Sequence, residues 1–143
     1  MKRSALFVCI FLLISILLSG CSGTFDWDGT VSELEDIGLT VDQCYTTGDE
    51  LEAITRSFNT DVLLNGGVFT VEVKRYTTLI KNGDYSQNCQ LVEFATRDEA
   101  KSYADLYVIS RNDRSSFSIA RCDTYVIITN LDEAMQAIDL EFK

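Results

Sequence analysis

The chain has 143 residues and carries 12 lysines and arginines against 22 aspartates and glutamates, a formal charge of −10. Such an acidic balance argues against nucleic acid as a partner, and the length suits one compact domain. The sequence contains no histidine, so the usual base of nucleophilic catalysis and the commonest zinc ligand are both missing.

The first 21 residues have the layout of an export signal. Lys2 and Arg3 precede an almost wholly apolar run over residues 6–18, which is too short for a membrane-spanning helix. The run leads into LSGC at residues 18–21. This tetrad resembles the lipobox of bacterial lipoproteins, in which the final cysteine, here Cys21, follows the cleavage site.

The resemblance implies a lipid-anchored protein of the cell envelope. Residues 1–20 would be a signal peptide, Cys21 would carry diacylglycerol, and the acyl chains would hold the protein on the extracytoplasmic face of the cell membrane. Loss of the signal changes the formal charge from −10 to −12, because Lys2 and Arg3 leave with it. Residues 21–29 then form a short tether and residues 30–143 a single α+β domain. An ordinary secretory signal or an uncleaved anchor is the alternative.

Residues 25–30 read FDWDGT and resemble the first motif of the haloacid dehalogenase phosphatases. In that family Asp26 would be the nucleophile and Asp28 the general acid on either side of Mg²⁺. The motif needs a buried strand leading into it, and only residues 22–25 separate Asp26 from Cys21. We therefore expect the end of a tether and the start of a helix.

The remaining elements follow in chain order from capping signals and from the period of apolar residues. Helices are predicted to start near residues 30, 47, 96 and 130, and strands are predicted over residues 39–45, 68–79, 89–95, 117–121 and 124–129. The four helix starts share capping-box spacing, in the pairs Thr30 and Glu33, Thr47 and Glu50, Thr96 and Glu99, and Asn130 and Glu133. Turns are expected at residues 82–84 and 122–123.

This order predicts an α+β fold with a ferredoxin-like split βαβ sandwich, in which helices pack on one face of an antiparallel sheet. Short N- and C-terminal helices and an edge strand would be additions to it. The alternative is a different α+β meander of the same elements. The sheet face away from the helices would be mostly polar and either solvated or a shallow binding surface. Its residues would be Thr40, Asp42, Thr70, Glu72, Lys74, Ser116 and Ser118, with Leu91 as the apolar exception.

The cysteines give a test of the split topology. In it, the end of the first strand meets the start of the third, so Cys44 and Cys89 are expected to be neighbours at a distance that strand twist could adjust to a disulfide. Cys122, at a hairpin tip, would be a free thiol. Three unpaired thiols are the equally weighted alternative.

The sequence indicates a non-catalytic binding domain of the cell envelope, with no cofactor and no metal site. Its expected partners are the membrane, through the lipid on Cys21, and an envelope protein or small ligand. The alternative is a small envelope hydrolase or thiol-dependent enzyme that uses Cys122 or an Asp/Glu pair. A purely structural or immunity-type envelope component is also compatible with the sequence.

Overall fold

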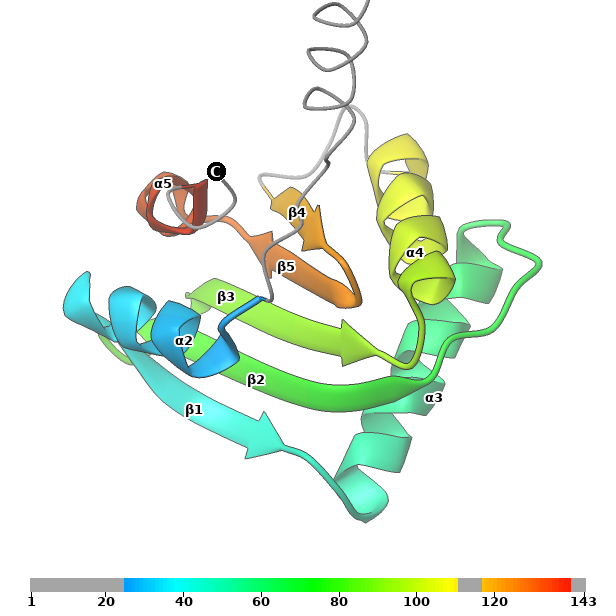
Figure 1. Cartoon of the computed structure of the whole chain (residues 1–143), viewed down its shortest axis with the longest axis horizontal. Helices are drawn as coiled ribbons and strands as arrows, with labels where there is room; N and C mark the ends of the chain where they lie inside the picture. The colour runs from blue at the N-terminus through cyan, green and yellow to red at the C-terminus, as the bar shows by residue number, and fades with distance from the viewer. Residues whose placement is uncertain (1–24, 111–116, 140–143) are drawn as a thin grey trace, which may run out of the picture.

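A computed structural model describes residues 25–110 and 117–139 as an α+β fold (Figure 1). The elements, in chain order, are α2 (Trp27–Asp36), β1 (Leu39–Tyr45), α3 (Asp49–Leu64), β2 (Val73–Lys81), β3 (Asp84–Phe94), α4 (Arg97–Ser110), β4 (Ser118–Cys122), β5 (Tyr125–Thr129) and α5 (Asp132–Asp139). The predicted class and the order of helices and strands are therefore confirmed.

The five strands form one antiparallel sheet in the order β1-β2-β3-β5-β4. The α+β sandwich with an antiparallel sheet is confirmed, but the split βαβ strand order is wrong. A split order would place β1 beside β3, whereas β1 lies at the edge and pairs with β2 alone. The connection through α3 returns the chain to the neighbouring position in the sheet, as in a meander, whereas the connection through α4 skips one position, so that β5 rather than β4 lies beside β3.

Helices cover both faces of the sheet, as Figure 1 shows. On one face, α3 and α4 enclose a core with a strong aromatic content, made by Phe58, Phe94, Tyr103 and Tyr107 with aliphatic neighbours from β2, β3 and β5. On the other face, α2 and α5 enclose a second core. Its buried members are Trp27, Leu34, Leu39, Leu79, Cys89, Leu91, Ile127, Ala134 and Ile138. We call these the α3/α4 face and the α2/α5 face.

The expected polar face is therefore wrong. Two irregularities in the register cause the error, one between Val41 and Gln43 and one between Val73 and Arg75. Each β-bulge adds one residue and reverses the alternation of side chains beyond it. Leu79 consequently points to the α2/α5 face although it has the same parity as Val73, which points to the α3/α4 face.

The starts of the helices agree only partly with the capping signals. Thr96 caps α4 as expected, because its hydroxyl accepts a hydrogen bond from the N–H of Glu99 at 3.2 Å. Thr30 does not cap α2, since it lies inside the helix and donates to the carbonyl of Asp26 at 2.8 Å. For α3 the N-cap is Gly48, at a φ of 93°, rather than Thr47.

Candidate functional site

The residues that resemble a phosphatase motif have structural partners. Asp26 is the N-cap of α2, and its carboxylate accepts a hydrogen bond from the N–H of Gly29 at 3.0 Å. Asp28 is in the first turn and forms an ion pair with Arg75 at 2.9 Å. No strand precedes Asp26 among the described residues. Helix capping and an ion pair therefore account for the two aspartates.

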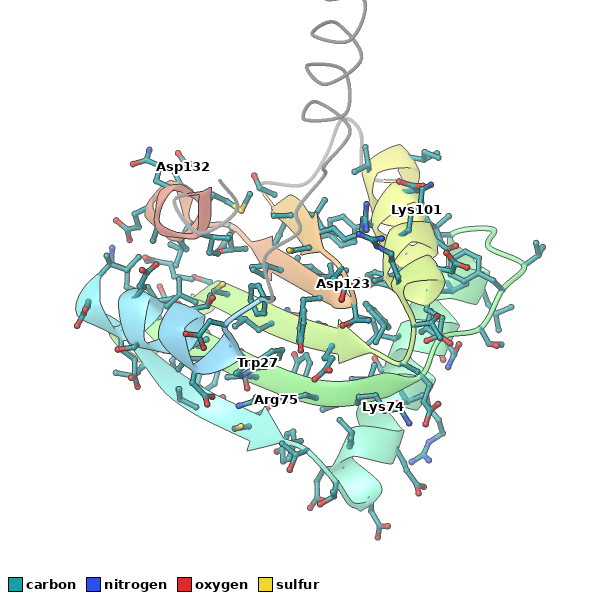
Figure 2. All side chains as sticks on the ribbon, in the orientation of Figure 1. Trp27, Lys74, Arg75, Lys101, Asp123 and Asp132 are labelled. Atoms are coloured by element: carbon teal, nitrogen blue, oxygen red, sulfur yellow. The ribbon has the colours of Figure 1, made fainter. Side chains whose placement is uncertain are left out.

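An aromatic cluster holds the start of the described chain against the sheet. The ring of Phe25 stacks on that of Tyr125, with 4.4 Å between centroids, and Trp27 lies 5.7 Å from Tyr125. The guanidinium of Arg75 lies 4.4 Å from the centre of the Trp27 ring, where a cation–π contact stabilises it. Figure 2 shows Trp27 and Arg75 next to each other beside α2. Burial raises the pKa of Tyr125, and the negative charge of Glu93 adds to the effect.

The expected neighbourhood of Cys44 and Cys89 is wrong. Strand β2 lies between their strands, with Cys44 opposite Thr77 and Cys89 opposite Leu79. Two strand spacings amount to about 9–10 Å, whereas a disulfide needs Cα atoms within about 7 Å. The structure has Cys44, Cys89 and Cys122 as thiols rather than half-cystines.

The three thiols have different environments. Cys44 is exposed and its sulfur accepts a hydrogen bond from the hydroxyl of Thr77 at 3.4 Å. Burial raises the pKa of Cys89 to about 12, and the nearby hydroxyl of Thr129 offsets only part of this effect. Cys122 is 3% exposed and precedes the Asp123-Thr124 turn of the β4–β5 hairpin. Since a thiol acts as a nucleophile only when ionised and accessible, Cys89 and Cys122 are poor nucleophiles.

Cys21 lies outside the described residues, as does Ser116 of the expected polar face.

The acidic pairs suggested for hydrolysis lie at the starts of helices, in the first turns of α3, α4 and α5. Negative charge is favourable there because of the helix dipole. Over residues 25–110 and 117–139, no group of three or more metal-binding side chains comes together.

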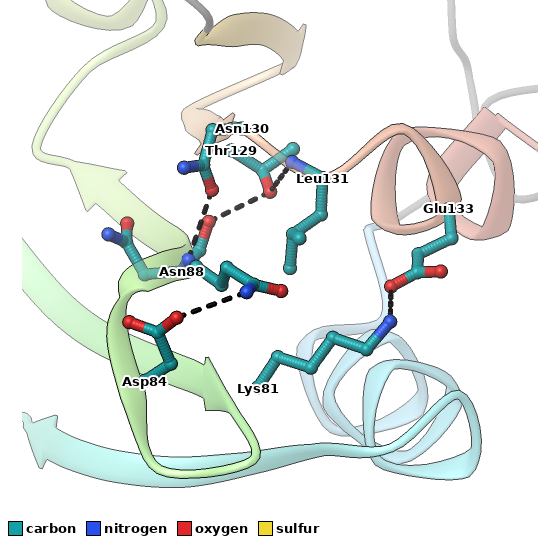
Figure 3. A network of polar contacts seen from close by, with 8 residues as sticks. Lys81, Asp84, Asn88, Thr129, Asn130, Leu131 and Glu133 are labelled. Atoms are coloured by element: carbon teal, nitrogen blue, oxygen red, sulfur yellow. Dashed lines mark hydrogen bonds and ion pairs between the residues drawn. The ribbon is translucent and has the colours of Figure 1, made fainter.

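A polar network joins the β2–β3 hairpin to α5 (Figure 3). The side-chain oxygen of Asn130 accepts from the N–H of Asn88 at 3.1 Å, and Thr129 donates to the carbonyl of Asn88 at 2.9 Å. Lys81 forms an ion pair with Glu133 on α5. The predicted capping pair of Asn130 and Glu133 is therefore wrong, because both residues bind the neighbouring hairpin instead.

The described part of the chain has surface hollows, of which we consider a smaller and a larger one. The smaller, of about 250 Å³, lies between α3 and α4 above β3 and β5. Its lining residues are Ser57, Phe58, Asp61, Gln90, Tyr103, Tyr107, Phe117 and Ile128. The hydroxyl of Tyr103 donates to the Asp61 carboxylate at 2.9 Å across this hollow, so a contact between the two helices already uses two of its polar groups.

The larger hollow, of about 490 Å³, lies where β1 stops short of the beginning of β2. We call it the α3 groove and define it by its lining residues Thr46, Gly48, Leu51, Glu52, Thr55, Arg56, Glu72, Val73 and Lys74. Strand β1 ends at Tyr45, opposite Tyr76, and the chain then turns away into α3. The groove thus occupies the position that a longer β1 would fill beside residues 73–75.

Side chains of α3 replace the missing strand in fixing this part of the chain. The amide of Asn59 accepts from the N–H of Val71 at 2.8 Å and donates to the carbonyl of Val71 at 2.9 Å. The hydroxyl of Thr55 accepts from the N–H of Val73 at 3.2 Å. The two walls of the groove are therefore held at a set distance, which makes it the preformed candidate site of the fold.

No pattern in the sequence indicates the α3 groove, apart from Thr55 as a polar residue within the apolar stripe of its helix. Comparisons with protein-family models, with characterised proteins and with solved structures give no match to this chain. None of the helices in the described residues is long and apolar enough to span a membrane.

Proposed function

We propose that this chain is a bacterial lipoprotein whose single α+β domain is a non-catalytic binding module on the extracytoplasmic face of the cell membrane. The observation that carries the proposal is the sequence LSGC at residues 18–21, which follows a basic start and an apolar run. Signal cleavage before Cys21 and acylation of its sulfur would give an anchor that needs no membrane-spanning helix.

The position of the folded domain is consistent with such an anchor. Phe25 already stacks on Tyr125, and α2 begins at Trp27. Cys21 and Phe25 are four residues apart, so an extended chain between them reaches at most about 14 Å. The domain would therefore be held against the membrane surface, with the aromatic cluster at the side where the tether arrives.

The α3 groove supports a binding role. It has an apolar floor of buried Leu51 and Val73, and a rim of exposed charged side chains. Ligand sites commonly combine an apolar lining with a few polar groups that fix orientation. In contrast, the enzymatic alternative relies on Cys122, which is buried, and on acidic pairs at the starts of helices, where the dipole explains them.

Metabolic labelling with an alkyne analogue of palmitate tests the anchor. We expect the full-length protein to take up the label and to fractionate with membranes. The Cys21→Ser variant should lose the label and accumulate as an uncleaved precursor that retains residues 1–20. Cys9→Ser, which changes the other cysteine of the signal region, is the matched control and should label normally. Undiminished labelling of Cys21→Ser would disprove the proposal.

A further inference from the structure

The exposed apolar side chains of the domain gather where α3 and α4 end. Among the described residues, seven large apolar side chains are exposed, and five of these belong to the last turns of α3 and α4 or to the loop after α3. They are Leu63, Leu64, Val68, Val108 and Ile109, with exposed fractions from 50% at Val108 to 100% at Val68. We call them the apolar tip. Single exposed apolar residues are ordinary, whereas a group of them indicates an interaction surface.

The parts of the apolar tip lie side by side on well-held backbone. A Cβ on Gly67 would lie 3.0 Å from the side chain of Leu106, so the loop after α3 packs against the last turns of α4. The N–H of Gly67 donates to the carbonyl of Val62 at 2.8 Å, and the Asn59 amide binds both backbone groups of Val71. Hydrogen bonds thus fix both ends of the loop, and the apolar side chains between them project into solvent.

The sequence around the apolar tip carries no charge. Residues 62–71 and 106–110 contain no lysine, arginine, aspartate or glutamate, although 24% of the whole chain is charged. Burial of the tip would therefore remove no ionised side chain of these segments from water. Since a chain with a formal charge of −10 is repelled by anionic headgroups, an uncharged surface is its most favourable contact with lipid.

The kind of side chain in the tip favours lipid over a partner protein. Leucine, isoleucine and valine are among the residues that enter the hydrocarbon region of a bilayer most readily. In protein interfaces, the binding energy is concentrated in tryptophan, tyrosine and arginine, and leucine and valine are under-represented. The tip consists of branched aliphatic side chains alone.

The proposed tether brings the apolar tip within reach of the membrane. Phe25 stacks on Tyr125, and α4 starts beside the same hairpin, where Arg97 pairs with Asp123 at 3.4 Å. From there α4 rises by about 20 Å over its 14 residues. This length is comparable to the reach of the tether, at most about 14 Å, so a bilayer that holds Cys21 can also meet the end of α4.

We infer that the apolar tip inserts into the bilayer that holds the lipid anchor, to the boundary between headgroups and acyl chains. The inference rests on the proposed anchor and goes beyond it, because acyl chains alone would leave the domain free to turn on its tether. Two contacts give it one orientation. The β2–β3 hairpin, at the opposite end of β2 from the α3–β2 loop (Figure 1), then points away from the lipid.

Quenching of tryptophan fluorescence by brominated lipid tests the insertion. Full-length protein acylated in cells is incorporated into phosphatidylcholine vesicles with or without bromine on the acyl chains, and Val68→Trp adds a reporter to the tip. We expect bromination to remove about half or more of the added fluorescence, because the reporter lies at the acyl boundary. The signal of the wild-type protein, which comes from Trp27, is subtracted.

Tyr85→Trp is the matched control. Tyr85 is 68% exposed and lies at the start of β3, so its replacement should show no quenching. Adding Leu64→Asp and Ile109→Asp to Val68→Trp should remove most of the quenching, since carboxylates are costly to place in lipid. A circular-dichroism melt of each variant establishes that it is folded.

The outcomes separate the insertion from the anchor. Protein that does not float with the vesicles would overturn both, and palmitate labelling would show whether the anchor is missing. Absence of quenching in floated Val68→Trp protein would overturn the insertion alone and leave the tip to a partner protein. Equal quenching of Val68→Trp and Tyr85→Trp would also overturn it, because the domain would then have no fixed orientation on the bilayer.

Discussion

The two faces of the sheet are closed by helices of different length and by side chains of different kinds. On the α3/α4 face, helices of 16 and 14 residues pack aromatic rings against the strands. On the α2/α5 face, helices of 10 and 8 residues cover mainly aliphatic side chains and the thiol of Cys89. The difference shows that helices of two to three turns are long enough to complete a core on one face of this sheet.

The largest expected effect comes from truncating one side chain of β3 on each face of the sheet. Phe94 is 1% exposed and lies 5.7 Å from Phe58 and 5.4 Å from Tyr103, centre to centre. We expect Phe94→Ala to lower the free energy of unfolding by about 3–5 kcal/mol and Leu91→Ala by about 2–4 kcal/mol, because each leaves a cavity in a packed core. Urea denaturation followed by circular dichroism measures both.

Val108→Ala is the control for this pair, since Val108 is 50% exposed and its truncation should change stability by less than about 0.5 kcal/mol. A cost for Leu91→Ala as small as that of the control would mean that the α2/α5 face is solvated. The comparison of two cores would then fail, and the polar face expected from residue alternation would be correct.

The α3/α4 face is the part of the fold that could be predicted from sequence. Residues 51–58 and 100–107 repeat their apolar positions with helical period, and β3, which contributes Val92 and Phe94, alternates in the ordinary way. The α2/α5 face could not be predicted from sequence. The bulges near Asp42 and Lys74 reverse which side chains of β1 and β2 point to each face of the sheet. Strand pairing was mispredicted for a separate reason, since local signals specify an element but not its neighbour in the sheet.

The α3 groove was hidden from sequence for a related cause. It exists because β1 is shorter than β2 and because Asn59 and Thr55 take over hydrogen bonds that a strand would otherwise make. Side chains that substitute for a strand leave no periodic signal. Thr55 and Asn59 are separated by one helical turn, which was the only local trace of this role.

The second prediction uses the thiol that is specific to the α2/α5 face. The pKa of Cys89 is raised from an ordinary value of 9.0 to about 12, so the unfolded chain loses this proton at lower pH than the native protein. The stabilisation is complete below pH 9 and declines as pH rises toward 12. Between pH 8.5 and 10 we expect the free energy of unfolding to fall by about 1 kcal/mol.

Cys89→Ala should abolish this part of the pH dependence, although its stability will be lower throughout. Cys44→Ala, at an exposed thiol, should retain the slope of the wild type. The window stops at pH 10 because burial also raises the pKa values of Tyr76 and Tyr125, which would add a decline of their own at higher pH. An identical slope in Cys89→Ala would show that this thiol is not buried in a core.

The smallest expected effect is at the first turn of α2, where the α2/α5 face begins. Asp26→Ala removes the N-cap and should cost about 1 kcal/mol, whereas Asp26→Asn keeps a capping oxygen and should cost only a few tenths. A phosphatase nucleophile would instead make the two variants equally inactive, because neither an amide nor a methyl group can be phosphorylated as a carboxylate is. Thermal unfolding of the three proteins gives the comparison.

Gly29 sharpens this test, because a Cβ there would come within 2.5 Å of the Asp26 carboxylate. Gly29→Ala should gain about 1 kcal/mol of helix propensity and lose a similar amount by displacing the cap, so its net effect should be near zero. In the Asp26→Ala background the clash is absent, and the same substitution should stabilise the protein. Equal effects in both backgrounds would mean that Asp26 does not cap α2, and the short helix would then depend on its packing against the sheet alone.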